Sequence, residues 1–593
     1  MVSALSKEMS DASTPTRSLS PVSREVIWRR MTAICDEMGT VLTAASYSPM
    51  IRDVRDWATG LADLKGRTIA ANTGGPPTHF PELGTNVLDG LEVYGEKGFS
   101  PGDAVMINHT AVTGQHINNV QIYSPIILDD GRLVGFANSF AHWQDVGGIT
   151  ANRPTSGTTD CYQEGLQIRS VKIYRAGQPD EDMLRVISGN LRTPAISLGD
   201  MRAQIASCRV GVARFKALVE EWSLETILAA VEWVWDEAAQ AAREAVAKIP
   251  DGVYRAESLL DYDGYTLGKT VPIKVEIRVE GSEMTMDFTN IADQAKGPLN
   301  SRSDAPANIA FKSLTTPYLP LTMGDFRPLK VICPDGKLIR ANPGAPMGSW
   351  SWPYTTIVDT ILKALEPALP DRVAAGNCGA LYGSGFFLGV DERTGKSFMS
   401  LSLIPVGWGG RPNGDGMTAH GFTLVQIRDT PVEVTEVICP LVVEGYRLRQ
   451  DSGGPGKFRG GVGVEYIVRC VYDTFVGFEL DRTLCPPWGL HGGSQGVHGA
   501  QLVILPDGTE VVPPARVINY RVSAGSRVVV ATGGGGGYGP PVERDPQHVL
   551  DDVIDEYVSA ASAEKDYGVA IVAKGDDFFI DFEKTKSLRA KLK

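Results

Sequence analysis

The stretch VQIYSPIILDDGRLVGFANSFAHWQDVGG, residues 120–148, contains two apolar runs separated by Asp-Asp-Gly. This pattern predicts a β-hairpin in which the glycine permits a short turn. His116 stands just before the first predicted strand, and His142 follows the second. Because the strands of a hairpin run antiparallel, both imidazoles emerge at the same end. We therefore expect His116 and His142 to be neighbours in space.

The composition of the chain is that of a large globular protein. It has 593 residues, 43% hydrophobic and 21% charged, with a net charge of −13. About two to four domains are expected at this length. The acidic balance argues against a nucleic-acid partner, and no apolar run reaches the roughly 18 residues of a membrane span. Eight cysteines without a CxxC pair indicate reduced, mostly buried thiols of a cytoplasmic protein.

Hydrophobic periodicity predicts an α+β, multi-domain fold with mixed sheets. Helical spacing begins near Ser23, a candidate N-cap, and residues 199–222 and 223–249 predict a helical hairpin. Residues 1–22 lack the apolar segment of a secretory signal. The expected units are a disordered tail over 1–22, an N-terminal α+β domain with the histidines and the helical hairpin over 23–250, a middle α+β domain over 251–375, a glycine-rich, strand-rich domain over 376–545, and a C-terminal helix and tail over 546–593.

Half of the histidines fall in one segment of the chain, and they are His79, His109, His116 and His142. Imidazole is the usual side chain for metal binding and for proton transfer near neutral pH, so this segment is the candidate reaction centre. Asp145 is a candidate to ligate a metal or to orient the ring of His142. Asp56, in IRDVRDW, is a second candidate carboxylate.

A structural role is the alternative for each of these groups. A histidine at a strand end commonly caps a carbonyl or faces water. Residues 145–148 also have the composition of a turn, in which the aspartate accepts backbone N–H bonds and the two glycines take positive φ.

The glycine runs contain no nucleotide-binding motif. TGGGGGYG, residues 532–539, lacks the Gly-Lys-Ser/Thr ending of a P-loop, and GGPGKFRGG, residues 453–461, has Phe458 where a hydroxyl is required. The chain also has no HExxH and no biotin-carrier lysine flanked by methionines. We therefore expect structural loops here, and neither a nucleotide site nor biotin on this chain.

Several long motifs follow one another in a fixed order: SREVIWRRMTAICDEMGTVLTAASYSPMIRDVRDW (23–57), PTHFPELG (77–84), AHWQDVGG (141–148), YQEGLQIRSVKIYRAG (162–177), DSGGPGKFRGGVGV (451–464) and TGGGGGYGPPVERDP (532–546). Together they resemble the hydantoinase B family over about residues 22 to 569. That family includes the second subunits of ATP-dependent hydantoinases and 5-oxoprolinases, and related subunits of acetone and acetophenone carboxylases.

The resemblance implies a hydantoinase A-type partner that binds ATP and phosphorylates the substrate, and a small additional subunit in the carboxylases. In some members it also implies a divalent metal (Mn, Zn or Mg) at positions matching His116, Asn119 and His142. Asn119 stands where the family usually has aspartate, and His109 stands at a second position where the family usually has aspartate. An amide oxygen is a poor ligand for Zn²⁺ or Mn²⁺, so these differences weaken the case for a tightly bound metal.

The resemblance leaves three functions open. The single histidine of HWQD and the two lost aspartates favour a subunit of a ketone carboxylase, which joins an activated ketone with bicarbonate. Trp143 or Trp57 near the site would suit an aryl ketone. The alternatives are a subunit of an ATP-dependent cyclic amide hydrolase and a non-catalytic structural subunit. In either catalytic interpretation, His142 acts as acid/base or ligand, Asp145 orients it and Asp56 is a secondary contact.

Overall fold

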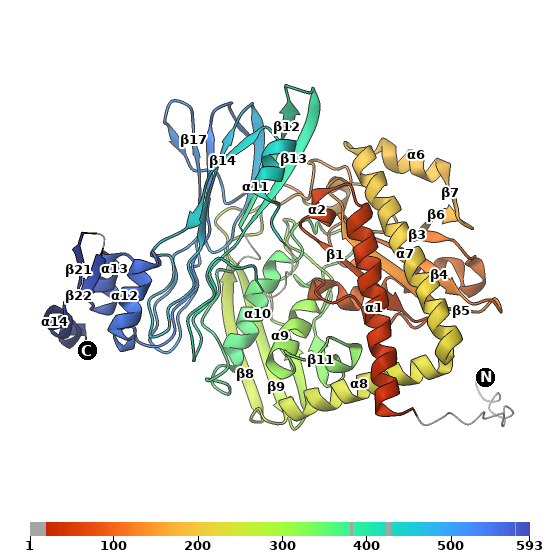
Figure 1. The fold of residues 1–593 in the computed structure, drawn as a ribbon, viewed down its shortest axis with the longest axis horizontal. Helices are drawn as coiled ribbons and strands as arrows, with labels where there is room; N and C mark the ends of the chain where they lie inside the picture. Colours follow the sequence, from red (N-terminus) through yellow and green to blue (C-terminus); the bar gives the residue numbers. More distant parts are fainter. Residues whose placement is uncertain (1–18, 380–382, 423–427, 576, 593) are drawn as a thin grey trace.

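The structure is a computed structural model that describes residues 19–379, 383–422, 428–575 and 577–592 (Figure 1). Its helices and separate sheets confirm the α+β, multi-domain class. The predicted tail over 1–22 lies almost wholly outside the described residues, and helix α1 begins at Pro21. None of the helices in the described ranges is long and apolar enough to cross a membrane. All eight cysteines are free, and six are buried.

An antiparallel sheet of seven strands forms the centre of the N-terminal part, in the order β2-β1-β5-β4-β3-β6-β7. The predicted hairpin is its middle pair, and Asn119 lies opposite His142 in the register. The strands are β1 Trp57–Ala62, β2 Thr68–Ala71, β3 Ala104–Ile107, β4 Asn119–Ile127, β5 Leu133–His142, β6 Val171–Arg175 and β7 Gln178–Pro179. The hairpin therefore lies in the interior of the sheet.

Two long helices, α1 (Pro21–Ala45) and α7 (Pro194–Trp222), cover one face of this sheet (Figure 1). The cap of α1 differs from the prediction, because Ser20 Oγ accepts the N–H of Ser23 at 3.1 Å and Ser20 is the N-cap. The predicted helical pair corresponds to α7 and α8 (Leu224–Val246), with Ser223 between them. Apolar residues of α8 continue from the core of the first sheet into the core of the next one.

Shorter elements cover the opposite face and the edges of the sheet. Helix α3 packs against β1 and β2 on the face opposite α1 and α7. The short elements of this part are α2 Pro49–Arg52, η1 Pro77–His79, α3 Phe80–Thr85, α4 Val87–Tyr94, η2 Glu96–Gly98, α5 Thr110–Thr113, η3 Cys161–Gln163 and α6 Glu181–Gly189.

Glu82 on α3 is buried and makes the stability of the fold depend on pH. It accepts a hydrogen bond from Ser303 Oγ at 2.6 Å, and burial raises the pKa of its carboxyl to about 7. The unfolded carboxyl titrates near 4.3. The folded chain thus keeps a proton that the unfolded chain loses, so the stability contributed by Glu82 is complete below about pH 4.3 and is lost as the pH rises through 7.

Glu82→Gln is expected to remove this pH dependence, because an amide accepts the same bond without ionising. Scanning calorimetry gives the difference in melting temperature between the variant and wild type at each pH. This difference should increase by a few degrees in favour of the variant from pH 5 to pH 8. Glu25→Gln on the exposed side of α1 is the matched control. Its melting temperature should change with pH in the same way as that of wild type. If the melting temperatures of Glu82→Gln and wild type changed with pH in the same way, the assignment of a buried, protonated carboxyl would be contradicted.

The middle part contains a four-stranded sheet, β11-β10-β9-β8, with helices α9 and α10 packed on it (Figure 1). Strand β9 alternates buried and exposed residues, as the sequence VPIKVEIRVE predicts. The elements are β8 Gly252–Leu260, β9 Val271–Glu280, β10 Glu283–Asp287, α9 Ala305–Thr315, η4 Met323–Phe326, β11 Leu329–Ile332 and α10 Trp352–Leu365.

The glycine-rich half folds into two antiparallel sheets that share one hydrophobic core. One sheet has the order β13-β12-β16-β19, and the other has the order β14-β15-β20-β17-β18. Their elements are β12 Gly383–Asp391, β13 Lys396–Ile404, α11 Val432–Ile438, β14 Leu441–Leu448, β15 Val464–Cys470, β16 Thr474–Glu479, β17 Ala500–Ile504, β18 Glu510–Val511, β19 Arg516–Val522 and β20 Arg527–Ala531.

The run of five glycines, residues 533–537, is fully buried among other backbone segments. Its N–H groups donate to the carbonyls of other segments, for example Gly535 to Gly461 at 3.0 Å and Gly536 to Gly376 at 2.8 Å. A Cβ on Gly535 would lie 1.9 Å from the carbonyl oxygen of Trp408. Glycine is therefore needed here for the close approach of main chains.

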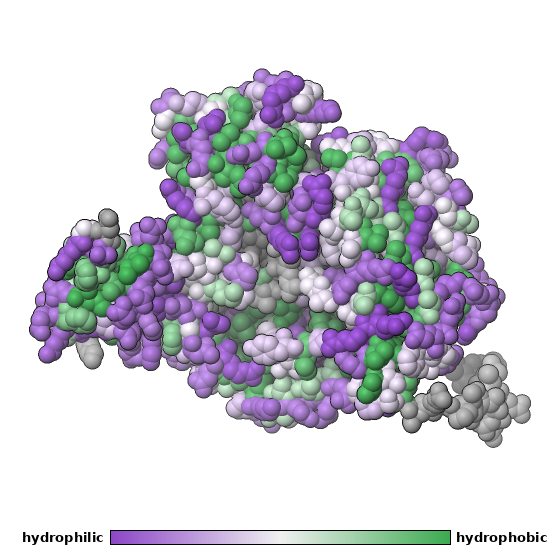
Figure 2. Space-filling view, in the orientation of Figure 1, coloured by the Kyte–Doolittle hydropathy of each residue, from purple (hydrophilic) through white to green (hydrophobic). Residues whose placement is uncertain are grey.

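The C-terminal residues form a small unit with a hydrophobic core of its own (Figure 1). The sequence predicts one helix and a charged tail over 546–593, whereas the structure has three helices and a hairpin there. They are α12 Pro546–Ile554, α13 Ala560–Tyr567, β21 Ile571–Lys574, β22 Asp577–Ile580 and α14 Phe582–Leu592, and the short helix η5, Pro541–Glu543, precedes them. Hydrophobic residues gather on this unit and over the strands at the top of the view in Figure 2.

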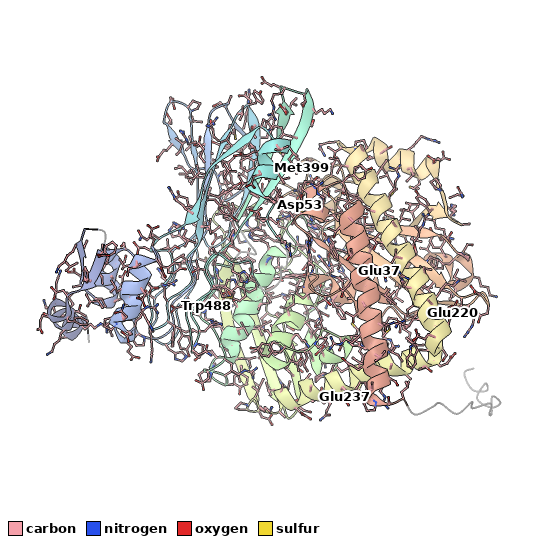
Figure 3. All side chains as sticks on the ribbon, in the orientation of Figure 1. Glu37, Asp53, Glu220, Glu237, Met399 and Trp488 are labelled. Carbon is pink, nitrogen blue, oxygen red and sulfur yellow. The ribbon has the colours of Figure 1, made fainter. Side chains whose placement is uncertain are left out.

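The N-terminal sheet meets the first glycine-rich sheet at helix α2. Met50 and Val54 pack there against Phe386, Leu401 and Leu403 of strands β12 and β13. Asp53, at the end of α2, and Met399 of β13 are labelled at this junction in Figure 3. The chain enters β1 directly after α2, so the junction lies beside the end of the hairpin.

Candidate active site

Asp56 stands between two of the histidines from the predicted cluster. Its Oδ1 lies 3.8 Å from His79 Nε2, and its Oδ2 lies 3.5 Å from His142 Nδ1. The backbone fixes this arrangement, since the N–H of His142 donates to the carbonyl of Asp56 at 3.0 Å. The side chain of Asp56 is 18% exposed, while those of both histidines are 4% exposed. Asp56 is therefore the most exposed of these three side chains.

His116 and His142 are in contact, as the hairpin predicts. Their ring centroids lie 4.8 Å apart, with an angle of 75° between the ring planes. His116 precedes β4 and His142 ends β5, so the antiparallel pairing brings them together. His109 does not share this contact. It caps helix α5, where its Nδ1 accepts the N–H of Ala111 at 3.3 Å.

The hydrogen-bond partners indicate the tautomer of His116 and place an oxygen atom at each nitrogen of His142. His116 Nδ1 lies 3.2 Å from the carbonyl oxygen of Gly348, which can only accept, so Nδ1 carries the proton. His142 Nε2 lies 3.2 Å from Asn152 Oδ1, and that oxygen is identified by the N–H of Arg153, which donates to it at 2.8 Å. His142 Nδ1 also faces an oxygen, Asp56 Oδ2 at 3.5 Å, so both nitrogens of this ring are placed to donate a proton to an acceptor. The unprotonated nitrogen of His116 is then Nε2.

Burial and neighbouring charges set the ionisation of the cluster. Burial lowers the pKa of His116 well below its usual value, and the charges of Arg153 and of the protonated form of His142 lower it further. Burial also lowers the pKa of His142, although the charge of Asp56 opposes that effect. For Asp56, burial alone would raise the pKa, but the adjacent imidazoles outweigh it and the pKa is lowered. Near neutral pH, His116 and His142 are therefore neutral and the carboxylate of Asp56 is ionised.

The predicted role of Asp145 is corrected by its contacts. Asp145 is fully buried, and its carboxylate accepts backbone N–H groups of Gly147, Arg192 and Thr193 and pairs with the Arg192 guanidinium. Its oxygens are thus engaged in the turn that leads into α7, as in the structural alternative for this segment. The carboxylate beside His142 is Asp56, predicted only as a secondary contact.

Neither tryptophan proposed from the sequence faces the cluster. Trp143 is buried on the α7 side of the sheet, where its Nε1 donates to Gln204 at 2.8 Å. The Trp57 indole lies against Gly39 of α1. The aromatic rings at the site are those of Trp350, whose centroid lies 5.8 Å from His79 and 5.9 Å from His116, and of Phe140, whose centroid lies 4.2 Å from His79.

The three residues that the resemblance implies as metal ligands do not form a metal-binding set. No group of three or more His, Cys, Asp or Glu side chains in the described ranges could hold a metal ion. Both nitrogens of His142 face Asp56 or Asn152. Asn119 donates from Nδ2 to Gln115 at 2.7 Å, and its Oδ1, without a hydrogen-bond partner among the described residues, adds a single neutral oxygen. These residues do not fit a tightly held divalent ion.

Several residues at the site carry no signal in the sequence. Gly348 and Trp350 come from the segment before α10, far from the hairpin along the chain. Asn152 and Arg153 follow the turn after β5, where their composition is that of an ordinary loop. A tertiary contact decides the role of each, and a single sequence does not contain it.

Comparisons with known proteins agree with this architecture. The family model for hydantoinase B/oxoprolinase matches residues 20–541. The chain belongs to this family. The B subunit of a putative D-/L-hydantoinase from a Pseudomonas species is 30% identical over 98% of this chain and 100% of that protein. Because the alignment covers nearly all of both proteins, this relative is homologous to the chain over its full described length.

Two solved structures share the fold of this hydantoinase B-type chain. ATP-dependent caprolactamase from Pseudomonas jessenii has a TM-score of 0.86 at 26% identity, covering 97% of this chain and 100% of that one. Nucleotide-free acetone carboxylase has a TM-score of 0.87 at 18% identity, covering 96% of this chain and 83% of that one. At 18% identity the second comparison concerns the fold alone.

Proposed function

We propose that this chain is the B-type subunit of an ATP-dependent enzyme that hydrolyses a cyclic amide. The observation that carries the proposal is the Asp56–His142 pair at the end of the hairpin, in which an ionised carboxylate lies 3.5 Å from Nδ1 of a neutral imidazole. Such a pair removes a proton from water and stores it on the imidazole, which the carboxylate then stabilises. These intact side chains also argue against a purely structural subunit.

The relatives support hydrolysis more strongly than carboxylation. The hydantoinase chain and the caprolactamase are named for cyclic amides and align with the whole chain at 30% and 26% identity. The sequence favours a ketone carboxylase partly because Trp143 or Trp57 would suit an aryl ketone, but both indoles face helices instead. The hydrolase, an alternative from the sequence, therefore becomes the preferred proposal.

The reaction is divided between two subunits in this proposal. A hydantoinase A-type partner binds ATP and phosphorylates the amide oxygen, which makes the amide carbon electrophilic. Water then adds to that carbon and gives its proton to the Asp56–His142 pair, the ring C–N bond breaks, and the ring nitrogen takes up a proton. Hydrolysis of the resulting acyl phosphate yields the carboxylate and phosphate. The B-type chain contributes the base and a buried site that limits stray water.

The test is an assay of this chain purified together with its A-type partner. We expect ATP-dependent release of ring-opened amino acids from at least one of 5-oxoproline, hydantoin and caprolactam, with ADP formed only when both subunits are present. The same complex is incubated with ATP, ¹⁴C-bicarbonate and either acetone or acetophenone. Incorporation of label into an acid-stable product, without any ring opening, would contradict the proposal and establish carboxylation.

A further inference from the structure

A short segment from the middle part of the chain, residues 347–349, crosses the end of the hairpin. The carbonyl oxygen of Gly348 lies 3.2 Å from His116 Nδ1, and this contact assigns the proton of that ring to Nδ1. Only glycine fits at this position, because a Cβ would lie 2.1 Å from the carbonyl oxygen of Pro154. The 347–349 segment is therefore closely packed against the loop that follows the hairpin.

Glu164 holds the 347–349 segment from one side. It is buried just after η3, and its carboxyl accepts the N–H of Met347 at 3.0 Å and that of Gly348 at 2.8 Å. Thr158 Oγ1 donates to the same carboxyl at 3.2 Å. Two successive amides of the segment thus bind one side chain, and this fixes the direction in which the Gly348 carbonyl points.

The side chain of Glu479 holds the segment from the other side. Ser349 Oγ donates to Glu479 at 2.5 Å, and Arg153 Nη2 lies 2.5 Å from the same group. Arg153 Nη1 also donates to the Gly348 carbonyl at 3.3 Å. The carbonyl has two lone pairs, one facing Arg153 and the other facing His116.

We propose that Glu164 is a positioning residue of the active site: by holding residues 347–349, it presents the Gly348 carbonyl to His116 and keeps that ring in the Nδ1–H tautomer. The tautomer of a neutral histidine is set by the hydrogen bond that one nitrogen makes. With Nδ1 protonated, Nε2 carries the lone pair of His116, whose ring centroid lies 4.8 Å from that of His142. The catalytic role of His116 rests on the proposed function, whereas its tautomer and its contact with Gly348 do not.

The test reads the tautomer directly, without substrate or partner. The full-length chain is labelled with ¹⁵N-histidine, and its eight histidines are examined by solid-state NMR. The His116 signals are identified by their loss in His116→Gln. We expect His116 to be Nδ1–H in wild type and in Glu164→Gln, because the amide oxygen still accepts the two backbone N–H groups. In Glu164→Ala we expect a shift toward the Nε2–H tautomer.

Activity of the assembled enzyme provides the second measurement. Glu164→Ala should lower kcat by about tenfold, while Glu164→Gln restores it to near the wild-type value. An Nε2–H tautomer in wild-type protein would overturn the proposal even if Glu164→Ala did not fold, and so would an unchanged His116 tautomer in Glu164→Ala. Failure of the complex to open any cyclic amide would instead count against the proposed function and leave the tautomer result standing.

Discussion

Gly535→Ala is expected to prevent accumulation of the folded chain. Gly535 lies in the middle of the buried glycine run, and an added Cβ would sit 1.9 Å from the Trp408 carbonyl oxygen and 2.5 Å from the N–H nitrogen of Gly409. Both neighbours are backbone atoms, so no side-chain rotation relieves the overlap. Separating the segments would break the hydrogen bonds that join Gly535 to Gly461 and Gly454.

The expected loss of stability exceeds about 4 kcal/mol, because it combines steric overlap with buried, unpaired backbone groups. Soluble yield and thermal unfolding measure it. Gly189→Ala is the matched control, since Gly189 is exposed and a Cβ there meets no atom within 4 Å. A Gly535→Ala protein with the yield and melting temperature of wild type would show that the glycine run is not packed as described.

His142→Ala is expected to lower kcat for ring opening by about 10²- to 10⁴-fold while the complex still assembles, because the imidazole that stores the water proton is removed. The ring is buried at the end of β5, so the melting temperature is measured in parallel to separate loss of chemistry from loss of fold. His109→Ala is the matched control, because His109 belongs to the same sequence cluster but caps α5. Equal losses in both variants would contradict a specific role for His142.

Local pattern in the sequence was sufficient to predict the hairpin and the meeting of His116 with His142. Two apolar runs and a glycine-containing turn leave an antiparallel pair as the simplest arrangement, and the geometry of the pair then places both ends together. The long helices and the alternation in β9 follow from periodicity in the same way.

The roles of the carboxylates could not be predicted in this way. Asp145 is three residues from His142 in sequence, yet its oxygens bind the turn before α7, and Asp56 reaches His142 only because β1 pairs with β5. The directions of Trp143 and Trp57 depend on which face of the sheet each strand end presents, and a one-residue change in register reverses that face. The Gly348 contact joins residues too distant in sequence for any local pattern to reveal.

The water-activating pair of this chain should be separable from the ATP step of its partner. In the assembled complex, wild type should release one ADP for each ring-opened product. Asp56→Asn should keep forming ADP in the presence of substrate while ring opening falls by at least about 10²-fold, because an amide accepts no proton from water at neutral pH. Asp53→Asn, which alters a nearby carboxylate paired with Arg52, should behave as wild type.

The most direct test is therefore the ratio of ADP to ring-opened product for Asp56→Asn. We expect a ratio at least about 100 times that of wild type. Ring opening at the wild-type rate with an unchanged ratio would contradict the assignment of Asp56 and His142 as the water-activating pair.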